Sequence, residues 1–402
     1  MRFDESTLYN IYSKLNGKRY PLYDLALWKN GLAFKKIDFS DAGVPVIKIA
    51  ELNNGISGNT SYTKQIFSDD VHLKKEDLLF SWSGNPQTSI DIFKFQLQEG
   101  WLNQHIFKVT PNEEIVDRDY FYFLMKYLKP WFTQIASNKQ TTGLGHVTIA
   151  DIKRMSVLVP SLTMQKKIVD VLKPINDKIQ INASINKNLL EQAQSIFTEE
   201  FLMLDRIPDG WQESSLLGIA DYLNGLAMQK YRPKDDEQGL SVIKIKELRQ
   251  GSCDFNSELC SPSIKPEYIV HDGDVIFSWS GSLLVDLWCG GTCGLNQHLF
   301  KVTSSTYDKW FYYAWTNHHL QKFAAIAADM ATTMGHIKRE ELSKAEVLIP
   351  SQSDYDRIGG LLAPLYDLVI ANRIVNRKLA SLRDELLPQL MSGQLDVSEV
   401  SL

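Results

Sequence analysis

The chain has 402 residues, enough for two or three domains that each bury a core of their own. Its 44% hydrophobic and 23% charged residues are those of an ordinary soluble protein, and no apolar run approaches the roughly 20 residues of a membrane-spanning helix. The first residues lack the basic and apolar stretches of a secretory signal, so we expect a cytoplasmic protein.

The charge balance gives no overall basic footprint for nucleic acid, because the formal net charge is −5. Residues 1–203 contain 24 Lys and Arg against 22 Asp and Glu, and the remainder contains 19 against 26. Neither half is strongly basic. If the protein binds DNA, the positive charge must be local or a partner must supply much of it.

An internal repeat organises the chain, since six segments return in the same order. The offset between matching residues drifts from 197 to 190, as expected when loops change length around a fixed core. The matching pairs are residues 30–33 and 224–227, 46–49 and 242–245, 80–84 and 277–281, 102–105 and 295–298, 145–146 and 335–336, and 157–161 and 347–351. The chain is therefore a tandem duplication.

Each copy begins with a part rich in short β-like runs, at about residues 20–160 and 211–350. Runs such as VPVIKIAEL, DLLFSWSG and HIFKV are separated by Gly, Asn, Asp and Ser turns, and an aromatic helical segment interrupts them at residues 120–131 and 310–323. A long helix follows each Pro-Ser boundary. We predict an α+β fold in which a mixed α/β domain plus a long helix is duplicated.

The two long helices carry apolar positions that step by four and three residues, the spacing of a coiled-coil seam. Pro174 and Pro364 occupy equivalent places, where we expect each helix to kink or restart. Both seams turn polar at matching positions, which predicts amides that hydrogen-bond across an antiparallel helix pair and fix its register. About 30 paired residues would make a rod of about 45 Å. The polar positions are Asn182, Asn186, Asn372 and Asn376.

The repeat separates two kinds of candidate DNA contact, because two similar modules on a spacer can read two different half-sites. Residues identical in both copies cannot carry the difference, so they should build the module or contact phosphates. These are Ser81, Trp82, Ser83, Asn103, Gln104, His105 and His146 in the first copy, and Ser278, Trp279, Ser280, Asn296, Gln297, His298 and His336 in the second.

The loops that differ between the copies should hold the sequence-reading side chains, which offer hydrogen bonds to base edges or phosphates. In the first copy these are Lys35, Lys36, Asn85, Gln87, Lys94, Asn138, Lys139, Gln140 and Thr141. In the second they are Gln229, Lys230, Arg232, Lys234, Ser282, Thr332 and Thr333. A solvated loop residue remains the alternative interpretation for each of them.

Several features have plainer alternatives. Trp82 and Trp279 lie between small residues, as packed turn aromatics do, and the recurring histidines lack a nucleophile or carboxylate at catalytic spacing. The four cysteines all lie in the second copy, so small buried hydrophobic residues are favoured over a zinc site. No P-loop and no Asn-Pro-Pro-aromatic tetrapeptide of amino-methyltransferases is present. We therefore expect a binding protein with no catalytic residues, metal or cofactor of its own.

The chain resembles the specificity subunits of type I restriction–modification systems over essentially its whole length. The resemblance is carried by residues 207–211 (IPDGW), 347–351 (VLIPS) and 385–393 (ELLPQLMSG), although residues 17–20 (GKRY) replace the opening motif in the first copy. It implies target-recognition domains at residues 1–160 and 206–350, and helical spacers at 161–205 and 351–402.

The resemblance also implies a bipartite asymmetric target in double-stranded DNA and partnership with two modification (methyltransferase) subunits and with restriction subunits. S-adenosylmethionine and ATP with Mg²⁺ would belong to those partners, and no membrane would be involved. Two alternatives stay open: a self-contained DNA methyltransferase or nuclease, and a coiled-coil assembly scaffold that does not bind DNA.

Overall fold

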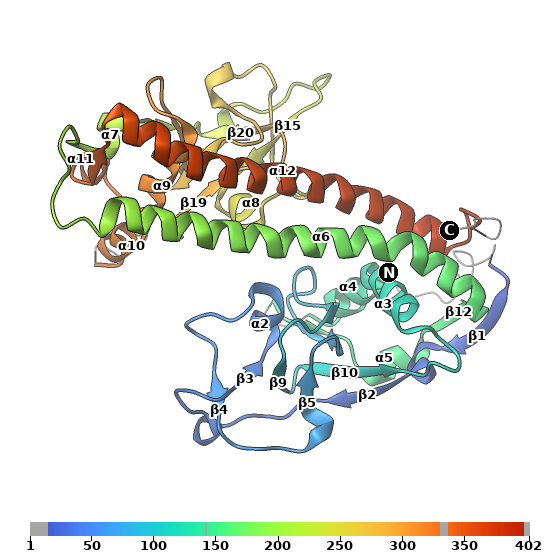
Figure 1. The fold of residues 1–402 in the computed structure, drawn as a ribbon. Helices are drawn as coiled ribbons and strands as arrows, with labels where there is room; N and C mark the ends of the chain where they lie inside the picture. Colours follow the sequence, from blue (N-terminus) through green and yellow to red (C-terminus); the bar gives the residue numbers. More distant parts are fainter. Residues whose placement is uncertain (1–14, 141–142, 330–336, 398–402) are drawn as a thin grey trace. The chain divides into compact units, whose positions relative to one another are not determined.

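The computed structural model describes residues 15–140, 143–329 and 337–397. The chain forms two compact units, the first made of residues 1–177 and 381–402 and the second of residues 178–380. Two long helices, α6 (Leu162–Phe197) and α12 (Gln352–Met391), each contribute one part to each unit (Figure 1). The sequence prediction placed a domain boundary before each helix, whereas the contacts divide the chain within both helices.

The first copy contains two four-stranded sheets and two short strand pairs. One sheet is antiparallel in the order β2-β10-β6-β8, and the other has the order β4-β3-β9-β5 with β3 and β9 parallel. The strands are β1 (Gly17–Pro21), β2 (Ala26–Asn30), β3 (Val44–Ile47), β4 (Tyr62–Thr63), β5 (His72–Lys74), β6 (Leu78–Ser81), β7 (Ser83–Gly84), β8 (Asp91–Lys94), β9 (Glu99–Leu102), β10 (Ile106–Pro111), β11 (Gly145–His146) and β12 (Ser156–Pro160).

Strands β1 and β12 pair antiparallel, as do β7 and β11. The helices of the first copy are η1 (Leu22–Leu25), η2 (Lys36–Asp38), α2 (Ile49–Asn54), η3 (Asp69–Val71), α3 (Arg118–Tyr127), α4 (Lys129–Asn138) and α5 (Ile149–Arg154). Helix α3 begins at Asp117, whose carboxylate accepts the backbone N–H groups of Asp119 and Tyr120 and so caps the helix.

The second copy repeats both sheets in the same strand order, β14-β21-β18-β19 and β16-β15-β20-β17, with β15 and β20 parallel. Strands β13 and β22 pair as β1 and β12 do. The strands are β13 (Gln212–Ser215), β14 (Asp221–Asn224), β15 (Leu240–Ile243), β16 (Leu259–Cys260), β17 (Ile269–Val270), β18 (Val275–Ser278), β19 (Leu284–Leu287), β20 (Cys293–Leu295), β21 (Leu299–Thr303) and β22 (Glu346–Ile349). The duplication read from the sequence is therefore present in the topology.

A π-helical turn, η4 (Thr198–Leu202), extends α6 into the second copy. The remaining helices are α7 (Leu216–Ile219), η5 (Met228–Lys230), α8 (Ile245–Gln250), η6 (Pro266–Tyr268), α9 (Lys309–His318), α10 (Leu320–Asp329) and α11 (Arg339–Ser343). The tryptophan of the opening motif, Trp211, donates its indole N–H to Asp354 at 2.9 Å and so joins the start of β13 to α12.

In the second unit, α6 and α12 pair antiparallel, as the heptad pattern predicts (Figure 1). Asn182 Nδ2 donates to Asn376 Oδ1 at 2.8 Å, and Asn372 Nδ2 donates to Asn186 Oδ1 at 2.9 Å. Farther along, Arg357 makes two hydrogen bonds to the Glu200 carboxylate. The contacts pair rising residue numbers in α6 with falling numbers in α12. Both helices continue through Pro174 and Pro364, so the predicted restart at those prolines is wrong.

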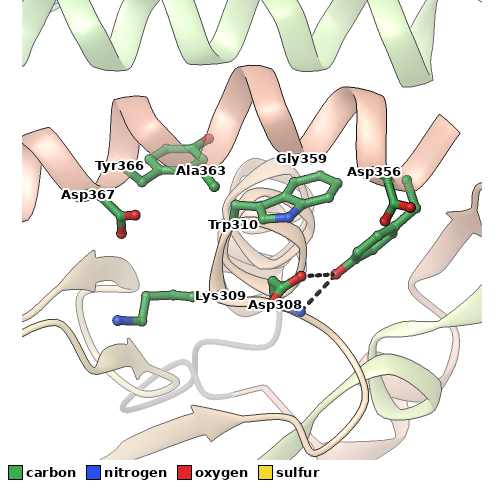
Figure 2. Close-up of a pocket in the computed structure, with 9 residues that line it drawn as sticks. Asp308, Lys309, Trp310, Asp356, Gly359, Ala363, Tyr366 and Asp367 are labelled. Atoms are coloured by element: carbon green, nitrogen blue, oxygen red, sulfur yellow. Dashed lines mark hydrogen bonds between the residues drawn. The ribbon is translucent and has the colours of Figure 1, made fainter. Parts of the chain in front are cut away.

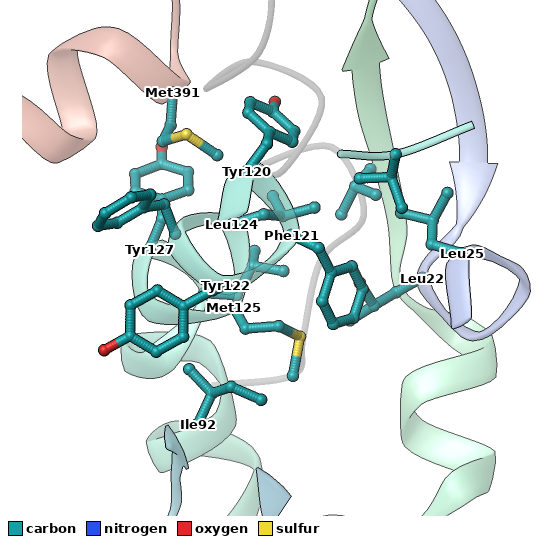
Figure 3. Packing of buried hydrophobic residues seen from close by; sticks show 14 of the residues in the cluster. Leu22, Leu25, Ile92, Tyr120, Phe121, Tyr122, Leu124, Met125, Tyr127 and Met391 are labelled. Carbon is teal, nitrogen blue, oxygen red and sulfur yellow. The ribbon is translucent and has the colours of Figure 1, made fainter. Parts of the chain in front are cut away.

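The last turns of α12 belong to the core of the first unit. Leu387, Leu390 and Met391 pack in one buried cluster with Ile168 and Leu172 of α6 and with the inner face of α3. Figure 3 shows Met391 beside the aromatic side chains of α3. Burial of such side chains is worth about 1.5–3 kcal/mol each, so α12 contributes to the stability of both units.

By length and composition, α12 is the one helix among the described residues that is apolar enough to cross a membrane, and most of its apolar stretch is not buried. The buried face contributes Ile358, Leu362 and Tyr366 to the main core of the second unit. We interpret the apolar composition as that of one half of a helix pair.

Two predicted segments differ in detail. The run VPVIKIAEL is a strand only as far as Ile47, after which α2 begins, because Glu51 accepts the backbone N–H of Lys48 and starts a helix. Each aromatic segment is two short helices, α3 with α4 and α9 with α10. In the first copy the break coincides with Pro130, which stands in the first turn of α4.

Asp91 is a buried carboxylate held by two lysines of the first copy. Lys126 Nζ lies 2.9 Å from Asp91 Oδ1, and Lys129 Nζ lies 2.6 Å from Asp91 Oδ2. Burial by itself would raise the pKa of Asp91, but the two ammonium groups outweigh it and hold the pKa below its ordinary value. Ionised Asp91, paired with the two lysines, therefore stabilises the fold at neutral pH. This contribution is lost as the pH falls through the folded-state pKa of Asp91.

We expect Asp91→Asn to lower the free energy of unfolding by about 2 kcal/mol at pH 7, because two partly buried lysines lose their counter-charge. The difference from the parent should shrink below about pH 4, where the parent carboxylate also becomes neutral. Urea unfolding at several pH values measures this. Asp24→Asn, at an exposed position, serves as the control. A difference that is the same at pH 3 and pH 7 would contradict the argument.

Candidate nucleic-acid interface

A polar edge of the first copy, which we call the Trp82 edge, gathers several predicted residues. Trp82 follows β6, its indole N–H donates to Asn30 Oδ1 at 3.1 Å, and its ring stacks on Phe107 with centroids 5.7 Å apart. The turn between β9 and β10 brings Gln104 and His105 to the same edge, where the His105 ring lies 5.5 Å from that of Trp82. Strand pairing places His146 opposite Ser83. The Trp82 edge is thus Asn30, Trp82, Ser83, Gln104, His105 and His146.

The second copy builds an equivalent Trp279 edge from the same contacts. Trp279 Nε1 donates to Asn224 Oδ1 at 3.0 Å, and its ring lies 5.7 Å from that of Phe300. Ser280 Oγ lies 3.1 Å from His298 Nδ1. The Trp279 edge is thus Asn224, Trp279, Ser280, Gln297 and His298. Both copies therefore keep the Trp–Asn hydrogen bond and the Trp–Phe ring contact.

Close approach of the backbone at Gly31 and Gly225 holds these edges together. The segment after Gly31 crosses the β9–β10 turn, where Leu32 N donates to Leu102 O at 2.9 Å and Gln104 N donates to Leu32 O at 2.9 Å. A Cβ atom on Gly31 would lie 2.2 Å from Asn103 O, and one on Gly225 would lie 2.3 Å from Asn296 O. No side chain fits at either position, which explains why the repeat keeps glycine there.

A half-buried ion pair recurs behind each edge. Lys108 Nζ lies 2.8 Å from Asp77 Oδ2 and donates to His72 O at 2.8 Å. In the second copy Lys301 Nζ lies 2.8 Å from Asp274 and donates to Ile269 O at 2.9 Å. Each lysine joins its β10 or β21 strand to the neighbouring sheet, so the repeated Phe-Lys-Val-Thr segment has a structural role.

Some of the repeated residues proposed as contacts lie inside the modules. Ser81 and Ser278 are wholly buried, and Asn296 and Ser280 are nearly so. Asn103 is half-buried. Side chains without exposed surface can position the edge but cannot reach a phosphate, so of the two roles given to the repeated residues, Ser81 and Ser278 have the structural one. Among the repeated residues, His105 and His146 have exposed side chains.

Three of the loop cations are held by carboxylates. Lys94 lies 2.6 Å from Asp119 and has a side chain only 9% exposed, and Lys139 donates to Asp151 Oδ1 at 2.6 Å. Arg232 lies 3.5 Å from Glu258. Their charges are compensated within the protein, and Lys94 in particular is a structural residue.

The remaining loop candidates lie at exposed positions. In the first copy Lys35 and Lys36 lie at the start of η2. Asn85 and Gln87 form a turn in which Asn85 Oδ1 accepts the Gln87 N–H at 2.9 Å. Asn138 and Gln140 lie at the end of α4. The exposed residues are Lys35, Lys36, Asn85, Gln87, Asn138 and Gln140 in the first copy, and Gln229, Lys230, Lys234 and Ser282 in the second. Thr141, Thr332, Thr333 and His336 lie outside the described residues.

Sequence reasoning missed two members of the edges, Asn30 and Asn224. Both stand at the start of the repeated Asn-Gly-Leu-Ala segment, so the repeat itself contained the signal, but only the fold brings them to the tryptophans. Trp82 and Trp279 pack against phenylalanines, as expected for packed turn aromatics. The indole N–H of each also donates to an asparagine of its edge.

The cysteines do not converge. Cys253 and Cys293 lie with their Sγ atoms 3.7 Å apart, while Cys260 packs with Met228 and Val242 in a separate cluster. A hydrogen bond with Cys293 lowers the pKa of the Cys253 thiol, and burial raises the pKa of Cys289 to about 11. Among the described residues, no group of three or more His, Cys, Asp and Glu side chains is placed to hold a metal ion.

Comparison with known proteins finds similarity to type I restriction specificity domains. Residues 16–191 match the family model of the type I restriction modification DNA specificity domain. The chain is also 24% identical over 323 residues to the type I restriction enzyme MjaIX specificity subunit of Methanocaldococcus jannaschii, a match that covers 74% of this chain and 73% of that protein. Residues 16–191 of the chain are therefore similar to this specificity domain, and the similarity to a whole specificity subunit extends over 74% of the chain.

Two further similar proteins are also named as specificity or S subunits. The type I restriction enzyme HindI specificity subunit of Haemophilus influenzae is 18% identical over 407 residues, covering 80% of this chain and 87% of that one. The crystal structure of the type I restriction–modification S subunit from M. genitalium aligns with a TM-score of 0.54 and 12% identity over 94% of this chain and 96% of that chain. At that identity the likeness shows the fold, which is the predicted α+β duplication with paired long helices.

Proposed function

We propose that the chain is a specificity subunit of a type I restriction–modification system. It reads a bipartite, asymmetric double-stranded DNA target, one block with each copy, and has no catalytic residues of its own. The observation that carries the proposal is the pair of edges, which share the Trp–Asn hydrogen bond and the Gln-His turn but are flanked by different exposed loops. The shared edges would place both modules on DNA in the same way, and the loops that differ would give each module a different half-site.

The two classes of residue then have separate roles. Gln104 and His105, with their counterparts Gln297 and His298, are the same in both copies and would contact the phosphate–sugar backbone. Asn85 follows the Gly84 turn beside the first edge, and Ser282 holds the matching place beside the second. Side chains of this kind form hydrogen bonds to base edges in the major groove.

Partner subunits supply what this chain lacks in the proposal. The net charge of −5 provides little of the counterion release that drives DNA binding, so two modification subunits would contribute much of the affinity. S-adenosylmethionine would be bound by those subunits, and ATP with Mg²⁺ by restriction subunits. The complex would act in the cytoplasm, without a membrane. The domains would be residues 1–160, 161–205, 206–350 and 351–402, as the sequence predicts.

Matched substitutions beside the two edges test whether each copy reads one block of the target. In cells that carry the modification subunit, we expect Asn85→Ala to relax one block of the methylated target and Ser282→Ala to relax the other. Loss of one base-specific contact costs about 1–3 kcal/mol of discrimination at one base pair. Mapping methylated adenines across the genome, site by site, measures both blocks at once.

The control variants are His105→Ala and His298→Ala, which should lower the methylated fraction at all sites without changing the sequence read, as loss of a phosphate contact does. If Asn85→Ala and Ser282→Ala altered the same block, the assignment of one block to each copy would be wrong. To test for catalysis, the purified chain is incubated with duplex DNA and labelled S-adenosylmethionine. Transfer of label without the modification subunit would overturn the non-catalytic role, and an unchanged target after exchange of residues 20–160 with a relative would favour a scaffold.

A further inference from the structure

A cavity of about 410 Å³ lies in the second unit, between the start of α9 and the outer face of α12 (Figure 2). Aromatic rings and carboxylates line it together: Trp310, Tyr355 and Tyr366 form the walls, and Asp308, Asp356 and Asp367 surround them. Lys309 is the one cation among its nine lining residues, and its Nζ lies against Gly273. Three carboxylates against one ammonium leave the cavity acidic, and none of its residues has a part in the recognition edges.

Trp310 leaves an unused hydrogen-bond donor at this cavity. The side chain is only 3% exposed, and within the described part of the chain its indole N–H has no acceptor. Gly359 passes so close that a Cβ there would lie 3.0 Å from Trp310 Nε1. Figure 2 shows the indole lying beneath Gly359 of α12, with its nitrogen on the side of Asp308. The Trp310 nitrogen is not among the wholly buried atoms that lack a partner, so its N–H is accessible to an acceptor that enters the cavity.

Tyr355 holds the opposite wall in place. Its hydroxyl accepts the backbone N–H of Asp308 at 2.7 Å and donates to Asp308 Oδ2 at 3.2 Å. Its ring centroid lies 5.0 Å from that of Trp310, at 45°. The rings are therefore fixed without a ligand, and the parts that line the cavity offer an aromatic surface, which attracts cations.

The first copy shows what the cavity lacks. The helices align at Pro174 and Pro364, so Lys173 corresponds to Ala363 and Asp177 to Asp367. In the first copy Lys173 forms an ion pair with Asp177. In the second copy Ala363 removes that ammonium, and Asp367 has no ion-pair partner among the described residues.

Two further replacements work in the same direction. Val169 becomes Gly359, which opens space over Trp310, and Lys166 becomes Asp356, which reverses a charge. The duplicated element has thus exchanged two lysines and a valine for an open acidic space. One copy carries its own cation at this place, and the other is shaped to accept one.

We propose that this cavity binds a lysine or arginine side chain of a partner protein. The cationic group contacts Asp367 where Lys173 contacts Asp177 in the first copy, its stem lies against Tyr366 and Trp310, and a backbone carbonyl of the partner accepts the Trp310 N–H. Because the first copy has Lys173 and Val169 where this cavity has Ala363 and Gly359, the site binds one partner segment per chain and distinguishes the two otherwise similar modules.

Calorimetry on the full-length chain tests the proposal with Nα-acetyl-arginine amide, which offers a guanidinium and a backbone carbonyl. Nα-acetyl-citrulline amide has the same shape without the charge. We expect the arginine probe to bind at least about tenfold more tightly than the citrulline probe, because the neutral urea loses the ionic and cation–π contacts. Equal binding of the two probes, or no binding of the arginine probe, would overturn the proposal.

Variants taken from the chain itself locate the site. Ala363→Lys introduces the residue of the first copy, which should occupy Asp367 and weaken the arginine probe by about tenfold or more; Asp367→Asn should do the same. Asp177→Asn is the matched control in the first copy and should leave binding unchanged. Circular dichroism confirms folding of each variant. Unaltered binding in Ala363→Lys and Asp367→Asn would place the probe elsewhere, and binding of spermidine in preference to the arginine probe would contradict a protein segment as the occupant.

Discussion

Gly31→Ala should strongly destabilise the first copy. The new Cβ would lie 2.2 Å from Asn103 O and 2.4 Å from Leu102 O, both backbone atoms that cannot rotate away. The segment after β2 must then separate from the β9–β10 turn, which breaks the hydrogen bonds that hold Leu32 and Gln104. We expect a loss of about 3 kcal/mol, as for strongly overpacked sites.

Hydrogen exchange separates this local effect from general destabilisation. In Gly31→Ala, amide protection should fall in β2, β9 and β10 and stay close to the parent value in β14, β20 and β21. Gly225→Ala, with a Cβ 2.3 Å from Asn296 O, should give the mirror-image result. Gly58→Ala is the control, because nothing lies within 4 Å of its Cβ, and it should change stability by less than about 0.5 kcal/mol. A Gly58→Ala effect equal to that of Gly31→Ala would exclude steric overlap as the cause.

The sequence predicts the features that repeat or have a period. The duplicated segments locate β6 and β18, and the four-and-three spacing locates the pairing faces of α6 and α12, including the amides at Asn182 and Asn376. The duplication allows the two copies to be compared with each other, because residues that are identical in both mark the positions that the shared fold requires. This is why the fold class and the helix pair follow from the sequence alone.

Side-chain partners brought together by the fold do not follow from the sequence. The sequence suggests that Lys94 and Lys139 are unpaired loop cations. In the structure Asp119 pairs with Lys94, 25 residues away, and Asp151 pairs with Lys139, 12 residues away. The helix after β3 depends on Glu51 accepting a backbone N–H, which alternating apolar residues conceal. Asn30 becomes part of the candidate interface only because the strand ends beside Trp82, 52 residues later. Non-local pairing decides each of these cases.

The amide pairs of α6 and α12 provide a test of what fixes the helix register. Asn186 is 6% exposed, and its Oδ1 accepts from Asn372 Nδ2 at 2.9 Å while its own Nδ2 donates to Val369 O at 3.4 Å. Asn372→Leu leaves Asn186 Oδ1 buried without a donor. We expect this single variant to lose about 2 kcal/mol, the cost of a buried unsatisfied polar atom plus the lost hydrogen bond.

The double variant Asn186→Leu with Asn372→Leu should recover that loss and equal or exceed the parent, because two apolar side chains replace a buried polar pair. A double-mutant cycle in urea would then show a coupling of at least about 1 kcal/mol. Asn188→Leu, at an exposed position of α6, is the control and should change stability by less than about 0.5 kcal/mol. Additive losses in the cycle would mean that the two amides do not act as a pair. Recovery would mean that they are kept for the register they impose, since a seam of leucines binds as strongly but tolerates a shift of the helices.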